Sequence, residues 1–388
     1  MGTYNITDFG ASADGKTINT KAIQLAIDAC HKAGGGTVLC TGGSFRTGTL
    51  TLKSNVHLHL EEGCKILGSE SLDDYEDLEA PGFMGENAPE KSRNCLIKAV
   101  DAENITVTGT GEINGSGLAF YDHGKTDSSG KLDKPETPRP RMIMFYKCRN
   151  VLFEDTSYID SPCWTFWLMK CEDVAIHRIK IRGNRIMRNV DGIDIDACRN
   201  VTVSDCIMDT EDDCVALRSI QNMYDTPAVC ENVTVTNCVL ESSSQGVRIG
   251  CPSDGLIQNC TFSNLVINSS YGGIIIQNPR GYLAEGSSGG AEIHDIVFSN
   301  ITINCRRIPI WIFIEDGIRL KRLSDLSFSN FRIKGGSPCI VQGSRETAIR
   351  KISFSDMDIE TSGEDAVICR KCERIKFNNV ELSNKPEL

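Results

Sequence analysis

The chain has 388 residues, 40% hydrophobic and 24% charged, which is the composition of a soluble globular protein. Its formal net charge of −11 argues against a nucleic-acid partner, and it means that an anionic polysaccharide would need local cations in order to bind. No apolar run reaches the length of about 18 residues that a membrane-spanning helix requires, so no membrane partner is predicted.

The first predicted element is an amphipathic helix over residues 21–33 (KAIQLAIDACHKA). Its apolar side chains recur at helical spacing on one face, namely Ala22, Ile23, Ala26, Ile27 and Cys30. Gly34-Gly35-Gly36 then ends the helix. A helix in this place would cap the open end of a strand-built fold, which otherwise exposes backbone edges.

From residue 36 onward a short repeat replaces the helical pattern. An asparagine or aspartate, alternating β-branched residues and a polar turn recur in NITVTG at Asn104, NVLFED at Asn150, NVTVSD at Asn200, NVTVTN at Asn232 and DIVFSN at Asp295. One such unit cannot bury its apolar face, whereas stacked coils can. We therefore predict an all-β fold, a right-handed parallel β-helix of about ten coils that forms a single domain over residues 1–388. A sandwich or a propeller fits less well, because neither explains this repeat.

Two long segments interrupt the repeat. Residues 73–91 and 121–141 are acidic, contain glycine and proline, and show no hydrophobic period. Long segments of this kind inside a repetitive fold are typical of functional loops. We expect them to flank a groove.

The 18 cysteines recur at equivalent places in the repeat. Cys148, Cys171, Cys198, Cys230 and Cys372 each precede a short apolar strand by two residues, which predicts a ladder of buried free thiols and favours a reducing, cytoplasmic compartment. No signal peptide is visible, but a trimmed secreted chain would look the same, so the localisation is left open. Neither the six histidines nor the cysteines show convincing metal-ligand spacing, so no metal and no cofactor are predicted.

The densest chemistry lies between residues 189 and 219. Asp191 and Asp212 are 21 residues apart (212 − 191), close to one coil, and stacked coils lie about 4.8 Å apart. Asp213 follows directly. Clustered carboxylates raise one another's proton affinity, which can supply the acid and the base that a glycosidase needs. Adjacent aspartates are also ordinary turn residues or calcium ligands, so spacing alone leaves both interpretations open. Asp194 and Asp196 alternate with isoleucines and are expected on the outer face.

Over nearly the whole chain the sequence resembles glycoside hydrolase family 28, the polygalacturonase family. DFGASADGKTINTKAIQLAIDAC resembles the opening of that family, and NVDGIDIDACRNVTVSDC and DTEDDCVALRS resemble its two central motifs, Asn-Thr-Asp-Gly and Gly-Asp-Asp. The resemblance implies an inverting hydrolase. In it Asp212 would protonate the glycosidic oxygen, Asp191 and Asp213 would activate the attacking water, and Asn189 would bind substrate.

Two departures from the family pattern bear on the substrate. The third motif, Gly-His-Gly, aligns with Ser244-Gln245-Gly246, and the fourth, Arg-Ile-Lys, aligns with Ile275-Ile276-Gln277. The resemblance implies that the missing cations would hold the carboxylate of the leaving-group sugar. An amide cannot replace their charge-assisted hydrogen bonds. We therefore expect a neutral leaving-group sugar, as in rhamnogalacturonan hydrolases, with Gln245 and Gln277 in contact with it.

Several other side chains are candidates for substrate binding. Arg188 lies just before Asp191, and Arg248 and Arg280 lie beside the altered motifs, where they would supply relocated cations; the alternative for such arginines is a solvated strand edge. The remaining candidates are tryptophans, which stack on sugar rings when exposed and otherwise belong to the core: Trp164, Trp167 and Trp311.

The predicted function is hydrolysis of a pectic polysaccharide or oligosaccharide at galacturonate linked to a neutral sugar. The alternatives are a related glycosidase acting on another neutral-sugar linkage, a polygalacturonase with relocated cations, a polysaccharide lyase that uses calcium, and a non-catalytic carbohydrate-binding solenoid. The oligomeric state and the choice between endo and exo cleavage stay open.

Overall fold

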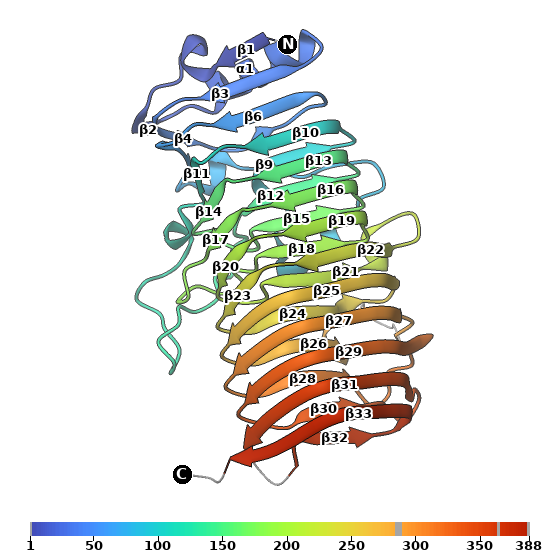
Figure 1. The fold of residues 1–388 in the computed structure, drawn as a ribbon. Helices are drawn as coiled ribbons and strands as arrows, with labels where there is room; N and C mark the ends of the chain where they lie inside the picture. The colour runs from blue at the N-terminus through green and yellow to red at the C-terminus, as the bar shows by residue number, and fades with distance from the viewer. Residues whose placement is uncertain (1, 284–288, 363–364, 386–388) are drawn as a thin grey trace. The chain divides into compact units, whose positions relative to one another are not determined.

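The computed structural model describes residues 2–283, 289–362 and 365–385. The chain forms two compact units, Met1–Ile193 with Asn200–Glu211 and Asp194–Arg199 with Asp212–Leu388, and each is described by itself. Strands dominate both units, and within each unit they stack as successive coils (Figure 1). The strands β18 (Ile193–Asp196) and β19 (Arg199–Ser204) lie where the sequence passes from one unit to the other.

Three parallel ladders build the first unit, one for each side of its coils. The first contains β1 (Gly2–Asn5), β3 (Gly36–Cys40), β6 (Val56–Leu60), β10 (Glu103–Thr108), β13 (Arg149–Glu154) and β16 (Glu172–His177). The second contains β2 (Asp14–Ile18), β4 (Gly43–Thr47), β7 (Cys64–Gly68), β11 (Glu112–Asn114), β14 (Ser157–Ile159), β17 (Lys180–Arg182) and β20 (Ile207–Thr210). The third contains β5 (Leu50–Thr51), β9 (Asn94–Val100), β12 (Arg141–Tyr146) and β15 (Phe166–Met169). A short strand, β8 (Glu76–Asp77), pairs antiparallel with β9.

Two parallel ladders build the second unit. One is formed by β22 (Val229–Thr236) and β23 (Val239–Ser242), followed by the 14-residue strands β25 (Leu256–Ser269), β27 (Glu292–Cys305), β29 (Arg322–Gly335), β31 (Ile349–Ser362) and β33 (Cys372–Lys385). The other is formed by β21 (Val215–Ser219), β24 (Gln245–Ser253), β26 (Gly272–Asn278), β28 (Ile308–Ile314), β30 (Cys339–Gln342) and β32 (Val367–Arg370). Parallel ladders with period-two side chains confirm the predicted parallel β-helix.

The predicted N-terminal helix is confirmed as α1 (Thr20–Lys32), which packs against β1 and β3 in the first unit. Ile23, Ala26, Ile27 and Cys30 form its buried face, while Ala22 is only half-buried. The other helical pieces are short 3-10 turns: η1 (Ile6–Phe9), η2 (Leu72–Asp74), η3 (Gly85–Asn87), η4 (Pro89–Lys91), η5 (Gly117–Phe120), η6 (Gln221–Met223) and η7 (Arg280–Tyr282).

The asparagine that opens each repeat has a backbone reason. Asn104 and Asn150 have φ values of 58° and 53°, in the left-handed region that asparagine tolerates better than most residues. Their side chains also bond from coil to coil, with Asn150 Nδ2 donating to Asn104 Oδ1 at 2.7 Å and Asn104 Nδ2 donating to Asn55 Oδ1 at 2.8 Å. The recurring Asn or Asp therefore turns the chain and ties neighbouring coils together.

A row of aligned phenylalanines runs through the second unit, buried as far as Phe354 and 49% exposed at Phe377. Phe262, Phe298, Phe328, Phe354 and Phe377 stack face to face with centroid separations of 5.0, 4.7, 5.1 and 5.2 Å. The strand register places these rings at equivalent positions in successive coils. The cysteines follow the same rule: 15 of the 18 free thiols are buried, all but Cys305, Cys369 and Cys372.

Candidate active site

The backbone around Asp191 is fixed within the first unit. Asp191 is buried, and its carbonyl accepts a hydrogen bond from the Thr165 N–H at 2.9 Å. Two residues earlier, Asn189 takes a φ of 57°, which turns the chain before the Asp191–Gly192 pair. Asp191 therefore lies two residues before β18, with its main chain held by the neighbouring coil.

A buried arginine from the 121–141 loop orients this turn. Arg139 is 2% exposed, and its Nη2 donates to Asn189 Oδ1 at 3.1 Å. Its Nη1 donates to Tyr121 Oη at 2.5 Å and to the Arg188 carbonyl. Glu90 Oε2 lies 3.3 Å from Nη2 and balances the charge. The orientation of the Asn189 side chain is thus fixed by the Arg139 guanidinium and by the backbone turn at Asn189.

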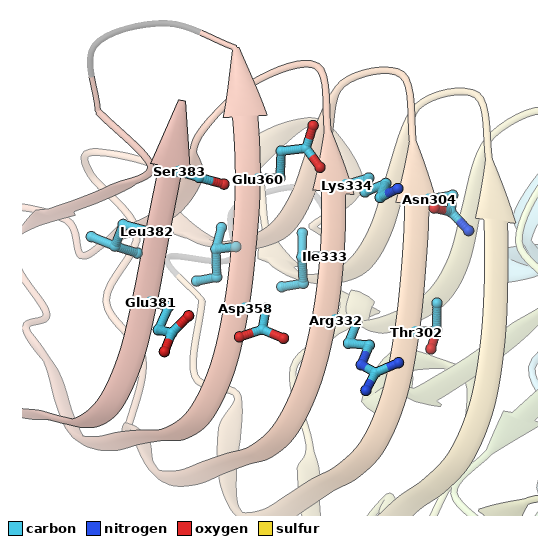
Figure 2. A pocket seen from close by; sticks show the side chains of 11 residues that line it. Thr302, Asn304, Arg332, Ile333, Lys334, Asp358, Glu360, Glu381, Leu382 and Ser383 are labelled. Atoms are coloured by element: carbon cyan, nitrogen blue, oxygen red, sulfur yellow. The ribbon is translucent and has the colours of Figure 1, made fainter. Parts of the chain in front are cut away.

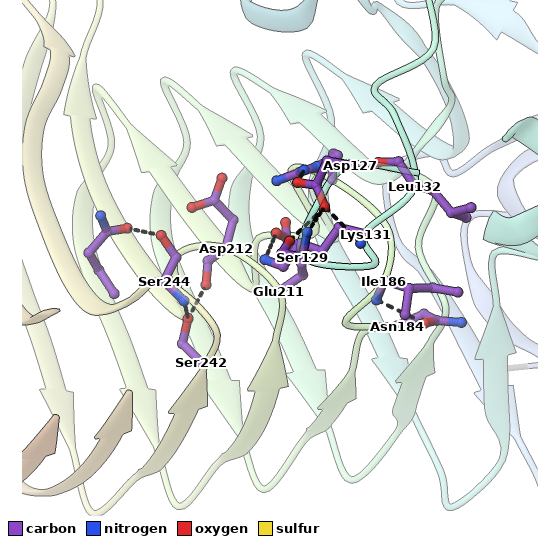
Figure 3. A network of polar contacts seen from close by, with 12 residues as sticks. Asp127, Ser129, Lys131, Leu132, Asn184, Ile186, Glu211, Asp212, Ser242 and Ser244 are labelled. Atoms are coloured by element: carbon purple, nitrogen blue, oxygen red, sulfur yellow. Dashed lines mark hydrogen bonds and ion pairs between the residues drawn. The ribbon is translucent and has the colours of Figure 1, made fainter. Parts of the chain in front are cut away.

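Ion pairs fasten the 121–141 loop to the residues around Asp191. Lys131 pairs with the buried carboxylate of Glu211 (Figure 3), and the Arg188 guanidinium pairs with Asp127. Arg188 Nε also donates to the Leu132 carbonyl at 3.2 Å. Apart from one isolated bridge between Thr126 and Leu132, the loop is irregular, as expected for a segment without period. Arg188, predicted to bind substrate, is therefore engaged by the loop.

Asp212 and Asp213 lie together in the second unit, just before β21. Asp212 is half-buried, and its carbonyl accepts a hydrogen bond from Ser242 Oγ at 2.6 Å (Figure 3). Asp213 is only 1% exposed. The two adjacent carboxyl groups therefore differ in environment, one reaching solvent and one enclosed.

Two arginines face the enclosed carboxyl group of Asp213. Arg218 Nη2 lies 3.5 Å and Arg248 Nη1 lies 3.6 Å from Asp213 Oδ2. Burial, the largest effect, and the charge of Asp212 raise the pKa of Asp213, the guanidinium groups of Arg248 and Arg218 lower it, and the net pKa is about 7. Asp213 therefore exchanges its proton near neutral pH.

Asp194 and Asp196 lie inside the second unit, which corrects the expectation that they face outward. Both side chains are fully buried. Asp194 Oδ1 accepts from Arg218 Nε at 2.6 Å, and Asp196 Oδ1 accepts from the Ile220 N–H at 3.1 Å. Because these aspartates alternate with isoleucines, the sequence predicted that they face solvent. Both faces of this strand are buried, and the aspartates are instead hydrogen-bonded inside the unit.

The altered family motifs occupy neighbouring coils of the β24–β26 ladder. Ser244 Oγ donates to Gln245 Oε1 at 2.6 Å, and both Gln245 and Gln277 are nearly buried. Arg248 pairs in register with Ile275, whose side chain is fully buried. The Arg280 side chain lies against the segment after β28, where its Nη2 donates to the Asp316 carbonyl at 3.3 Å; its backbone N–H donates to Glu315 Oε2 at 2.7 Å. Of the two arginines predicted to supply a relocated cation, Arg248 lies beside a candidate catalytic carboxylate.

Burial corrects the sugar-stacking prediction for Trp164 and Trp167. Within the first unit the Arg141 guanidinium lies 4.5 Å from the Trp164 centroid and 4.3 Å from the Trp167 centroid. Trp167 and Arg141 are fully buried, and Trp164 is 4% exposed. The indole faces therefore enclose a cation instead of presenting themselves to a ligand.

Trp311 has a different setting on β28 in the second unit. It is half-buried, and it lies beside two other half-buried aromatic rings, with centroids 6.3 Å away at Tyr271 and 5.5 Å away at Phe313. The ring remains available for contact with a ligand.

Several functional candidates were not predicted from the sequence. Arg218 stands alone among apolar residues in CVALRS, and a charge inside a buried strand requires an anionic partner, so this signal was available. Arg139 and Arg141 lie at the end of a segment that reads as loop, and nothing local marks them as buried. Tyr271 and Lys131 likewise become candidates only through contacts with residues distant in sequence.

Within the described ranges no group of three or more His, Cys, Asp or Glu side chains is arranged to hold a metal ion. No helix in that same part of the chain has the length and apolar character needed to cross a membrane.

Comparison with known proteins places the chain in a family. The model of glycosyl hydrolases family 28 matches residues 30–231 and 221–355. A probable polygalacturonase of Vitis vinifera is 29% identical over 223 residues, covering 55% of this chain and 44% of that protein. An exopolygalacturonase of Arabidopsis thaliana is 28% identical over 372 residues, covering 93% of this chain and 80% of its own length. The chain spans less than half the length of some of these relatives, including the Vitis protein.

Solved structures agree on the fold. An exopolygalacturonase of Thermotoga maritima superposes with a TM-score of 0.79 at 23% identity, covering 98% of this chain and 91% of the other. A surface adhesin of Streptococcus pneumoniae superposes with a TM-score of 0.67 at 16% identity, covering 99% of this chain and 91% of the other, so the fold alone does not distinguish hydrolases from adhesins. The family model matches most of the sequence, and the chain therefore belongs to glycosyl hydrolases family 28.

Proposed function

We propose that the chain is an inverting glycoside hydrolase that cleaves a pectic chain at galacturonate linked to a neutral sugar. Asp212 is the general acid that protonates the glycosidic oxygen, and Asp191 and Asp213 activate the attacking water. The observation that carries this proposal is the contrast between the two adjacent carboxyl groups. Asp212 is the more exposed and suits contact with a sugar bond, while Asp213 is enclosed between two arginines and suits a bound water.

Support for including Asp191 comes from the first unit. The backbone N–H of Glu211, the residue directly before Asp212, donates to the carbonyl of Val190, the residue directly before Asp191, at 3.2 Å. Val190 and Glu211, which are 21 residues apart in sequence (211 − 190), are thereby joined within the first unit. Inverting glycosidases leave room for a water between their carboxyl groups, which suits carboxylates on separate coils.

The neutral sugar is inferred from the altered motifs. Ile275 is buried and apolar, and Gln245 and Gln277 offer neutral amides. Amides hydrogen-bond sugar hydroxyls well, but they cannot supply a charge-assisted bond to a carboxylate. A rhamnogalacturonan-type linkage therefore fits better than a homogalacturonan linkage.

A product screen tests the substrate. We expect new reducing ends from rhamnogalacturonan and from its oligosaccharides, and at least tenfold less from polygalacturonate. Proton NMR of the first product should show the anomer opposite to that of the bond cleaved. A retained anomer, or a preference for polygalacturonate, would contradict the proposal, and an unsaturated product would indicate a lyase.

The pH dependence tests the assignment of Asp213. A general base must be ionised, and burial raises the pKa of Asp213 to about 7. We therefore expect kcat/KM to rise as pH increases through about 7. A profile with no rise through this range would contradict the assignment of Asp213 as the base. Initial rates from pH 5 to 9 at constant ionic strength distinguish the two profiles.

A further inference from the structure

An aromatic and cationic cluster lies on the second unit beyond the altered motifs. Tyr271 directly precedes β26, Arg307 directly precedes β28, and Trp311 lies on β28. The Arg307 guanidinium carbon lies 5.3 Å above the Tyr271 ring, whose centroid is 6.3 Å from that of Trp311. Both rings are half-buried and Arg307 is exposed.

Backbone hydrogen bonds relate this cluster to Asp212 coil by coil. Ser242 Oγ donates to the Asp212 carbonyl at 2.6 Å. Val215 pairs with Val247, so the residues three positions earlier in each segment, Asp212 and Ser244, lie opposite each other. The Tyr271 N–H donates to the Ser244 carbonyl at 3.2 Å, and the Ile308 N–H donates to the Tyr271 carbonyl at 3.1 Å. Asp212, Ser244, Tyr271 and Arg307 therefore occupy equivalent places in four successive coils.

The spacing of coils sets the reach of such a row. Neighbouring strands lie about 4.8 Å apart, so three steps carry the row roughly 14 Å from Asp212. That distance exceeds a single sugar ring, so a ligand that touches both Asp212 and Arg307 must be an oligosaccharide. Gln245, next to Ser244, lies on the second of the four coils, between Asp212 and the cluster.

The stacked arrangement leaves Arg307 able to bind an anion. A guanidinium group that stacks on an aromatic ring contacts the ring through its flat face. Its N–H groups lie in the guanidinium plane and point away from the ring, where they can bind a ligand. Those groups match a carboxylate through two parallel hydrogen bonds. Among the described residues no ion pair is recorded for Arg307, although several other exposed arginines, such as Arg178, are paired with acids. A cation held this way in a chain of net charge −11 favours an acidic ligand.

We propose that Tyr271, Arg307 and Trp311 form a subsite for a uronate sugar two to three residues along the chain from the cleaved bond. This inference rests on the proposed function and extends it. The sugar beside Gln245 is neutral, and the next acidic sugar is bound by Arg307 through its carboxylate while its ring lies against Trp311. The enzyme thus selects a chain in which acidic and neutral sugars alternate.

Binding to an inactivated enzyme tests the subsite without turnover. In the Asp212→Asn protein, calorimetry would compare an alternating galacturonate–rhamnose hexasaccharide with the same hexasaccharide after its carboxyl groups are reduced to alcohols. Adding Arg307→Met should weaken binding of the acidic ligand by roughly tenfold or more and leave the reduced ligand within about twofold, because a charge-assisted bond is lost only with the first. Arg307→Lys should recover part of the loss.

A matched control is Arg332→Met. Arg332 is an exposed arginine of β29 in a separate hollow of the same unit, beside Asp358 (Figure 2). It should change neither affinity. Equal affinity of the Arg307→Met and parent proteins for the acidic ligand would overturn the subsite, and so would equal weakening for both ligands. If the wild-type protein cleaves no pectic substrate but acidic-ligand affinity still depends on Arg307, the subsite stands and the proposed reaction fails.

Discussion

Asp212→Asn is expected to lower kcat on the true substrate by at least about a thousandfold. An amide has nearly the shape of the carboxyl group but cannot donate the proton that the departing sugar oxygen needs, and acid–base catalysis of this kind contributes roughly 10²–10⁴-fold. Asp212 is half-buried and asparagine keeps nearly the same side-chain shape, so the fold and its Tm should change little. Reducing-end release and circular dichroism measure the two effects.

Two comparisons make this result specific to proton donation. Asp209→Asn removes an aspartate three residues upstream that is 41% exposed and pairs with Arg185, so its rate should stay within about twofold of wild type. A substrate with a nitrophenolate leaving group, which departs without a proton, should be much less affected by Asp212→Asn. Substantial turnover of the natural linkage by Asp212→Asn would remove Asp212 from the role of acid.

The coil architecture was predictable because its signals are local and repeated. Asn104 and Asn150 recur at a position where the backbone requires a left-handed turn, so the same residue type marks the same place in each coil. The helix over residues 20–32 was predictable for a similar reason, since its apolar face and the glycines after it lie within one short segment.

The errors arose where a local pattern has two structural meanings. Alternation of Ile193 and Ile195 with Asp194 and Asp196 normally separates a buried face from a solvent face. Strands of a parallel fold can instead be covered on both sides, and all four of these residues are buried. Trp164 shows the same ambiguity, because a ring suited to a sugar is equally suited to a buried guanidinium.

The site was predictable only in part. Family motifs marked the aspartates, because those motifs are contiguous in sequence. The arginines around Asp213 could not be assigned in the same way, since Arg218 meets Asp194 across 24 residues and shares the Asp213 carboxylate with Arg248. Such neighbours depend on the register between coils, and one sequence does not give that register.

Removal of Arg218 is expected to cost about 3–5 kcal/mol of unfolding free energy at pH 8, because it takes away the guanidinium that bonds the buried Asp194 carboxylate and faces that of Asp213. Arg218 is 3% exposed, and its Nε bonds Asp194 at 2.6 Å. We predict this loss for Arg218→Met in urea denaturation. Arg178→Met is the matched control: its guanidinium is 54% exposed and pairs with Glu154 at 2.9 Å, so the loss should be below about 1 kcal/mol.

The pH dependence of this loss identifies its cause. The native pKa of Asp213, about 7, lies above the ordinary value of 3.8, so the native state holds more protons than the unfolded state between these values, and this group's contribution to stability falls as pH rises through that range. Without Arg218 the native pKa rises further and the range extends upward. The loss in Arg218→Met should therefore be larger at pH 8 than at pH 5, and the rising limb of kcat/KM should move to higher pH. Adding Asp194→Leu should recover part of the stability, because an apolar pair replaces a buried charge that has lost the Arg218 guanidinium. If Arg218→Met matched Arg178→Met at both pH values, the buried ion pair would contribute nothing to the fold or to the ionisation of Asp213.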